Sequence, residues 1–98
     1  MKEISFRIKE NSRLAKIAAK KLHSKSVAMV LGNNIYLHNV SKEEFLKNKK
    51  WLKHELCHIE QFKQHGFIGF IAKYLWESLN KGYQKNKFEI QARAAEEL

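Results

Sequence analysis

The segment LKHELCHIEQF, residues 52–62, places His54 and His58 four positions apart, with Glu55 directly after the first histidine. On an α-helix such a pair has Cβ atoms ~5–6 Å apart, so both imidazoles can reach one Zn²⁺ at ~2.0–2.1 Å. Glu55 lies beside that pair, where a carboxylate can take a proton from a zinc-activated water and pass it to a leaving amine. This HExxH pattern predicts the site of a zinc peptidase.

A helical wheel separates the two histidines from the core. At ~100° per residue, the side chains of Leu52, Leu56 and Ile59 form one apolar stripe. His54 and His58 lie together on roughly the opposite side of the helix. The alternative interpretation is a pair of solvated histidines on a basic helix, and the shared second face favours the metal site.

The motif supplies two ligands, so a third must come from elsewhere in the chain. All acidic residues are glutamates, which restricts the search for a carboxylate. His65 lies ~10 Å along the helix axis from His58 and is therefore rejected as a ligand. Glu77 and Glu89 remain. Glu77 returns to the level of the motif if its helix turns back, and Glu89 opens the last predicted helix.

The rest of the chain predicts an α+β fold in a single domain, residues 1–98, because this length fits one domain. Ile4, Phe6 and Ile8 alternate with polar residues, as in a half-buried strand. A helix should follow from about residue 12 to residue 22. Its apolar stripe consists of Leu14, Ile17, Ala18 and Leu22.

A β-hairpin is expected ahead of the motif helix. Two runs rich in β-forming residues, 26–31 and 35–38, flank the sequence Gly32-Asn33-Asn34. Glycine and asparagine tolerate a positive φ, which tight hairpin turns require. The first strand and this hairpin together predict a small sheet.

Three helical segments should follow the sheet. Ser41 opens a capping box before residues 42–65, with a break near Asn48. The next segment, 67–81, is apolar on most sides, so we expect it to be buried. The last segment runs from about residue 86 to the C-terminus. Its apolar stripe consists of Phe88, Ala92 and Ala95.

The charge of the chain indicates which kinds of partner it favours. The chain has 19 Lys and Arg against 10 acidic residues, a formal charge of +9, which favours acidic partners. A nucleic-acid binder is the weakest alternative, because no recognition motif accompanies its basic residues. Those residues would be Lys47, Lys49, Lys50 and Lys53.

The single cysteine excludes a disulfide framework. The start of the chain lacks an apolar signal segment, and the longest apolar run is too short to span a bilayer, so we expect a cytoplasmic protein.

The segments HELCHIEQF and GYQKNKFEIQARAAE resemble a group of very small bacterial HExxH domains. These domains are similar to the minimal gluzincin scaffolds called minigluzincins, and to a metallopeptidase-like core domain found near bacterial toxin-delivery proteins. The resemblance covers about residues 27–97. It implies a zinc peptidase that acts on a peptide or protein substrate, and it implies that so small a domain can be latent, with a terminal segment covering the zinc.

Residue by residue, the resemblance implies that Glu89 is the third zinc ligand and that Gln61 matches the glutamine after the second histidine of the family motif. Two positions depart from the family pattern. Arg93 stands where many gluzincins have an acidic residue that orients a zinc-bound histidine. Gln91 replaces the usual acid of the family's FE-x-EA segment.

The resemblance also implies where a substrate lies. Gluzincins lay an extended peptide along a strand ahead of the motif helix, which here corresponds to about residues 35–38. Ile35, Tyr36 and Leu37 are therefore the expected substrate-binding residues.

These observations predict gluzincin-type hydrolysis, with Glu55 as general base and acid. Tyr83 is the expected donor to the oxyanion, with His65 and Tyr36 as alternatives. A different class of function stays open: a zinc-stabilised binding module without hydrolysis, because a domain of this size has few walls for a specificity cleft.

Overall fold

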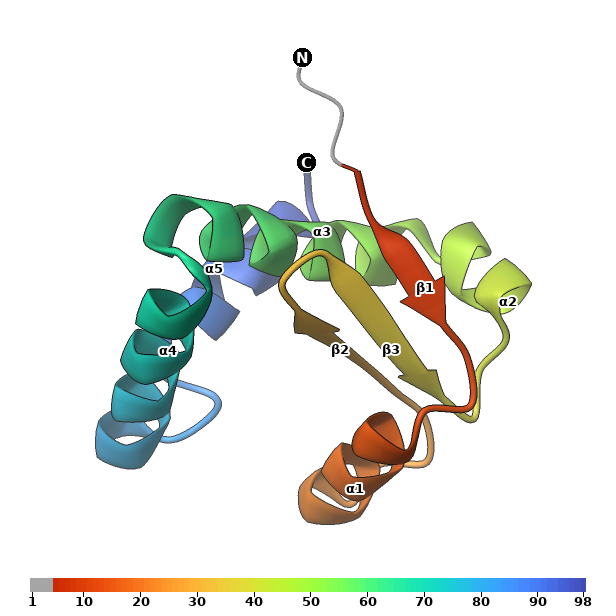
Figure 1. Ribbon diagram of the computed structural model, residues 1–98, viewed down its shortest axis with the longest axis horizontal. Coiled ribbons are helices and arrows are strands. Elements are labelled where there is room, and N and C mark those ends of the chain that lie inside the picture. The colour runs from red at the N-terminus through yellow and green to blue at the C-terminus, as the bar shows by residue number, and fades with distance from the viewer. Residues whose placement is uncertain (1–4) are drawn as a thin grey trace.

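The computed structural model describes residues 5–98, so Ile4 of the predicted first strand lies outside the described residues. The elements, in chain order, are β1 (Arg7–Lys9), α1 (Arg13–Leu22), β2 (Val27–Leu31), β3 (Asn34–His38), α2 (Lys42–Lys47), α3 (Lys49–His65), α4 (Phe67–Lys81) and α5 (Lys87–Ala95). The fold is α+β, as predicted, with a small sheet and helices (Figure 1). Within residues 5–98, no helix combines the length and the apolar character needed to cross a membrane.

The sheet has the strand order β1-β3-β2, with β3 in the centre. β1 runs parallel to β3, and β2 runs antiparallel to it in the predicted hairpin. Gly32 has a φ of 64° in the turn, a conformation that is strained for residues with a Cβ atom. Because β3 is in the centre, β2 is an edge strand of the sheet that residues 5–98 form. Helix α4 lies beyond the free edge of β2 (Figure 1).

The strand predicted to bind substrate lies in the centre of the sheet. Ile35, Tyr36 and Leu37 belong to β3, whose backbone pairs with β1 on one side and β2 on the other. The side chains of Ile35 and Leu37 are fully buried. An incoming peptide therefore has no free backbone edge at β3, and the free edge close to α3 belongs to β2.

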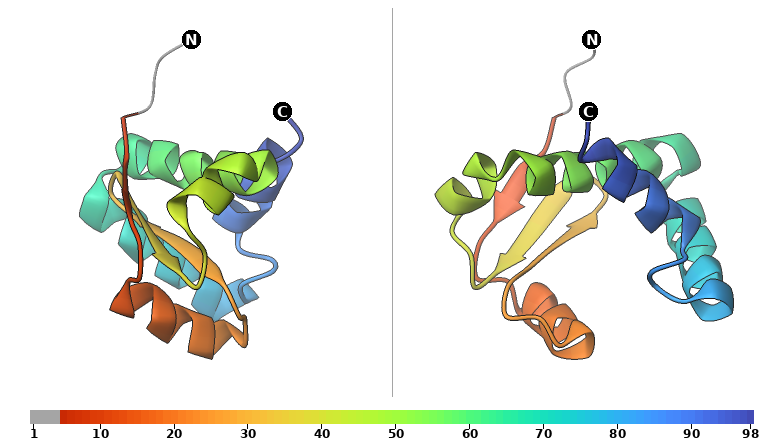
Figure 2. Two further views of the ribbon diagram at one scale, coloured as in Figure 1. Left: turned by 90° about the vertical axis from the view of Figure 1, so that its right-hand side faces the viewer. Right: turned by 180° about the vertical axis from the view of Figure 1, so that it is seen from behind.

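Helices cover both faces of the sheet (Figure 2). On one face, Ile59 of α3 packs with Phe45 and with the buried β3 side chains. On the other face, Ala15 and Ala19 of α1 pack against Val27. Of the predicted apolar stripe of α1, only Ala18 packs against this cluster, because the helix approaches the sheet through its small alanines. The large residues of that stripe are half exposed: Leu14, Ile17 and Leu22.

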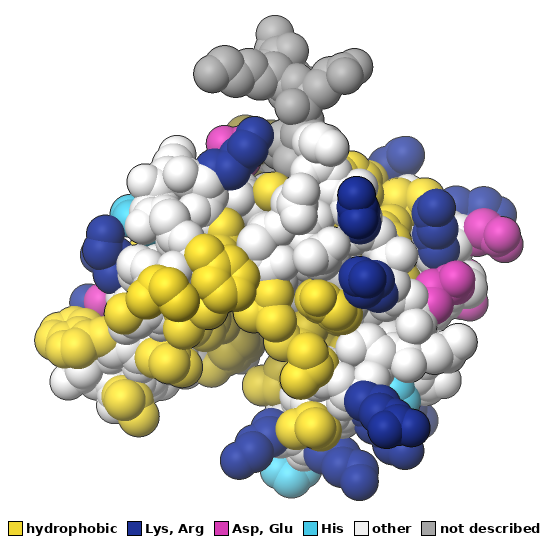
Figure 3. Space-filling view, viewed as in Figure 1, with side chains coloured by type: hydrophobic (Ala, Val, Ile, Leu, Met, Phe, Trp, Pro, Cys, Tyr) yellow, Lys and Arg dark blue, Asp and Glu magenta, His cyan; other side chains and the backbone are white. Residues whose placement is uncertain are grey.

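Helix α4 is mostly exposed, contrary to the prediction that it is buried. Of its residues, only Phe70 and Glu77 are buried. Gly66 and Gly82, with φ of 78° and 82°, turn the chain at its two ends, so α4 leaves α3 at an angle and meets the other helices along one side only. Its exposed surface carries a group of hydrophobic side chains (Figure 3). These are Phe67, Ile68, Leu75, Trp76 and Leu79.

Two asparagines begin the helices that carry the candidate site. The predicted break occurs at Asn48, whose Oδ1 accepts the N–H of Trp51 at 3.1 Å and caps α3. Asn86 caps α5 by accepting the N–H of Phe88 at 2.9 Å. Its Nδ2 also donates to the carbonyl of Tyr74 at 3.1 Å, so fully buried Asn86 joins α5 to α4.

We expect Asn86→Ala to lower the free energy of unfolding by ~2–4 kcal/mol, because it removes a helix cap and leaves buried polar groups without partners. Asn48→Ala removes one exposed cap and should cost ~1 kcal/mol. Urea denaturation of the two matched variants tests this difference. Equal losses would contradict the joining role of Asn86.

Candidate metal centre

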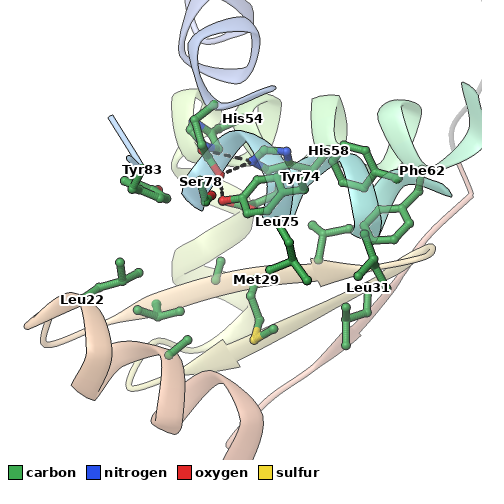
Figure 4. Close-up of a pocket in the computed structure, with 18 of the residues that line it drawn as sticks. Leu22, Met29, Leu31, His54, His58, Phe62, Tyr74, Leu75, Ser78 and Tyr83 are labelled. Atoms are coloured by element: carbon green, nitrogen blue, oxygen red, sulfur yellow. Dashed lines mark hydrogen bonds and ion pairs between the residues drawn. The ribbon is translucent and has the colours of Figure 1, made fainter. Parts of the chain in front are cut away.

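Three side chains from two helices converge on one point. His54 and His58 lie on α3, and Glu89 lies in the first turn of α5, which packs against α3. Oxygen Oε1 of Glu89 lies 3.0 Å from Nε2 of His54 and 3.2 Å from Nε2 of His58. The three candidate ligand atoms all lie within 4.8 Å of one another. Figure 4 shows His54 and His58 close together beside Tyr74, at the wall of a cavity.

The donor set and its spacing fit a transition-metal ion such as zinc. A tetrahedral ion with ligand bonds of ~2.0–2.1 Å separates its ligand atoms by about 3.3 Å. The Glu89–histidine separations are close to this value before any rearrangement. Two imidazole nitrogens and one carboxylate oxygen are also the donors of a catalytic site that keeps one position open.

The two candidate glutamates lie in different parts of the structure. Glu77 is buried elsewhere, where its Oε1 accepts the N–H of Lys87 at 3.0 Å, and this bond holds its pKa below the ordinary value. Glu89 alone of the two meets the histidines. The predicted apolar stripe of α5 explains this placement, because buried Phe88 and Ala92 fix the side of α5 that faces α3.

Glu96 orients the first histidine. Its Oε2 lies 2.7 Å from Nδ1 of His54, so this nitrogen carries the hydrogen and Nε2 faces the centre. The family pattern expects an acid at the position of Arg93, which instead donates to the carbonyl of Gln84. Glu96 lies two helical turns after Glu89 and on the same side of α5. That spacing is the signal in the sequence that could have identified it.

Gln61 orients the second histidine. Its Nε2 donates to the carbonyl of Phe88 at 3.1 Å and to Oε1 of Gln91 at 2.8 Å. A carbonyl can only accept, which fixes the orientation of the Gln61 amide. Its Oε1 must then accept from Nδ1 of His58, 2.8 Å away, so Nε2 of His58 faces Glu89. The departure at Gln91 is therefore accommodated by an amide-to-amide hydrogen bond.

Tyr74 holds the other carboxylate oxygen. Its hydroxyl donates to Oε2 of Glu89 at 2.5 Å, while its ring lies edge-on to His58. Burial, and then the neighbouring Glu89, raise the pKa of Tyr74, which keeps this donor protonated. The sequence gives no signal for Tyr74, because its role depends on how α4 docks against α5.

The negative charge of Glu89 and the positive charges of His54 and His58 stabilise one another. Burial, the largest single effect, lowers the pKa of His54 and His58. The hydrogen bonds and charge of Glu89, together with Glu96 at His54 and with Glu55 and Gln61 at His58, outweigh burial and raise the pKa of both rings above the ordinary value of 6.5. Burial alone would raise the pKa of Glu89. The hydrogen bonds with the two histidines, the charge of His58 and the hydrogen bond from Tyr74 together outweigh burial and hold that pKa well below 4.5. Without metal, the triad therefore forms a buried ion pair.

Glu55 stands beside this centre without belonging to it. Its side chain is buried and lines the same cavity as the triad. Desolvation raises the pKa of Glu55 to about 8, partly offset by the charge of His58. This carboxylate can therefore exchange a proton near neutral pH.

Tyr83 also lines the cavity, at its edge on the His54 side of the triad (Figure 4). Burial raises the pKa of its hydroxyl to about 12, followed by the charges of Glu89 and Glu55, so it remains a donor at neutral pH. The two alternatives lie elsewhere. His65 packs between Phe70 and Phe88, and Tyr36 packs beneath α1.

In comparisons with known proteins, no family model, no curated protein and no solved structure matches this chain. The geometry of the centre therefore carries the argument about function.

The metal-free protein should be most stabilised by the triad between pH ~4.5 and ~6.5. The contribution of Glu89 is present above the unfolded pKa of 4.5 and is lost as the pH falls. The contributions of His54 and His58 are present below 6.5 and are lost as the pH rises through their raised values. Glu55, with its raised pKa, also favours the folded state at low pH.

Urea denaturation of chelator-treated protein from pH 4 to pH 8.5 measures this window. Relative to Glu89→Gln, the wild type should gain about 2 kcal/mol near pH 5.5 and less at pH 8. A difference that is independent of pH, or largest at pH 8, would exclude a histidine–glutamate ion pair.

Proposed function

We propose that the protein is a zinc-dependent peptidase of the gluzincin type. The observation that carries the proposal is the convergence of His54 Nε2, His58 Nε2 and Glu89 Oε1 beside the buried carboxylate of Glu55. This set contains the three ligands of a catalytic zinc site and a separate group that can move a proton. The resemblance to small HExxH domains points the same way.

Zinc is the metal that this donor set suits best. Imidazole nitrogens favour zinc and its transition-metal neighbours, whereas Ca²⁺ and Mg²⁺ prefer oxygen ligands throughout. Glu96 and Gln61 hold Nδ1 of each ring, and this leaves Nε2 free to bind a metal when the ring is neutral. Binding requires the two rings to lose their extra protons, so zinc affinity should rise with pH.

When bound, zinc would polarise the scissile carbonyl and make an attacking water more acidic. Glu55 takes the proton of that water and delivers it to the leaving amine, a role for which a raised pKa is suited. The hydroxyl of Tyr83, at the edge of the same cavity, donates a hydrogen bond to the carbonyl oxygen as negative charge develops on it.

The substrate is an extended polypeptide beside β2. This strand has a free backbone edge, and it contacts the helix that carries the motif. A peptide that pairs with β2 passes His54, Glu55 and His58, which line the same cavity as the β2 residues. The expected substrate strand therefore moves from β3 to β2.

A second candidate function is a zinc-stabilised binding module without hydrolysis. The observation that favours it is the network around Glu89, which reaches α3 through His54 and His58, and α4 through Tyr74. A metal in this network would join three helices and contribute directly to folding.

Glu89→Gln should weaken zinc binding ~100-fold or more, whereas Glu77→Gln should change it less than about threefold. The first substitution removes a proposed ligand, and the second removes a buried carboxylate that caps α5 away from the histidines. Competition with a chromophoric chelator measures both affinities. The reverse ranking would contradict the assignment.

Glu55→Gln should keep zinc and lower the rate of peptide hydrolysis by ~10²–10⁴. Its amide has nearly the shape of the carboxylate but cannot accept the proton. Metal content and cleavage of a peptide library are measured on the same preparations. Loss of zinc from this variant would show that Glu55 is a ligand. Zinc retention with no cleavage even by the wild type would support the binding module.

A further inference from the structure

A groove runs between β2 and α4, and we call it the β2–α4 groove. It is a cavity of about 660 Å³, with the triad and Glu55 on its wall. Lys21 is the other charged residue that lines it, and the remaining lining is almost entirely apolar. Figure 3 shows hydrophobic side chains on α4 and along the hollow that separates α4 from α1. So large an exposed apolar surface marks a binding site for an apolar ligand.

The free edge of β2 determines the shape of that ligand. One side of this strand pairs with β3, and the backbone N–H and C=O groups of the other side face the groove. A peptide in extended form satisfies these groups by adding a strand. A helix or a small rigid molecule would leave them without partners, so the geometry favours a strand.

Side chains of an added strand point alternately to its two sides. The sheet lies between α3 and α1 (Figure 2), so one set points toward α3 and the other toward α1. On the α3 side the groove presents Phe62 beside Val30 and Leu31, and farther along it presents His54, Glu55 and His58. On the α1 side it presents Ala18, Lys21 and Leu22, and Phe70 and Leu75 of α4 face the strand from across the groove. In the part of the groove beside Phe62, both sets of side chains therefore meet apolar surface.

We propose that the β2–α4 groove selects extended segments with several consecutive apolar residues, of the kind that folded proteins bury. In the part of the groove beside Phe62, an alternating polar and apolar segment would place its polar side chains against one apolar wall. This inference rests on the proposed function, because the selected segment is the substrate of that site. The groove is continuous with the triad, since His54, His58 and Glu89 line it.

Binding is measured by fluorescence anisotropy on zinc-loaded Glu55→Gln protein, which should hold a peptide without cleaving it. The first probe is a labelled peptide with the run Val-Leu-Phe-Leu-Val between Gly-Ser flanks. The second has the same residues separated by serines. The third carries an N-methyl group on every residue of the run. We expect the second and third probes to bind at least about tenfold more weakly than the first.

Two leucines of α4 provide matched variants for the protein. Leu75, 54% exposed, lines the groove, whereas Leu79, 87% exposed, does not. Leu75→Gln in the Glu55→Gln background should weaken binding of the first probe about tenfold, and Leu79→Gln should leave it within about twofold. Both side chains are exposed, so neither variant should unfold the protein.

Three outcomes would overturn the inference. The first is equal binding of the run and the serine-separated peptide, and the second is undiminished binding of the N-methylated probe. The third is a dimer, detected by ultracentrifugation, that Leu75→Gln dissociates and the first probe does not. Failure of the proposed function would give another result. The protein would then bind no zinc, but it would still bind the first probe more tightly than the second and third.

Discussion

The carboxylate of Glu89, held between two imidazoles, is the interaction on which the rest of the structure depends. A buried carboxylate without partners is strongly unfavourable. Glu89 is almost fully buried and has partners on both oxygens, the histidines at Oε1 and Tyr74 at Oε2. Its position therefore constrains α3, α4 and α5 together, and Asn86 and Gln61 maintain that arrangement from either side.

The groups around the centre also decide what it can bind. Glu96 and Gln61 each accept a hydrogen from Nδ1, so both rings turn Nε2 toward one point. Without metal, that point is held together by protons shared between histidine and glutamate. For a cation that replaced those protons, the proposed ligands would already lie close together.

Local signals in the sequence predicted the motif helix, its break at Asn48, the hairpin and the apolar stripe of α5, because each depends on residues near one another in the chain. The choice of Glu89 as the third ligand rested on the family resemblance, because the spacing of residues in the sequence left both Glu77 and Glu89 open. Sequence reasoning failed where the answer depended on distant segments. β3 is the central strand because β1 pairs with it in parallel, and α4 is exposed because, among residues 5–98, no element covers most of its surface.

Zinc binding by the triad can be measured by zinc-edge X-ray absorption spectroscopy on tag-free protein that is purified without added metal and then loaded with one equivalent of zinc. We expect about four nitrogen or oxygen neighbours at ~2.0–2.1 Å, with the multiple-scattering pattern of two imidazoles. In Glu89→Gln this spectrum should lose an oxygen neighbour or disappear. A sulfur neighbour at ~2.3 Å, which only Cys57 or a methionine could supply, would contradict the assignment, as would failure to bind zinc.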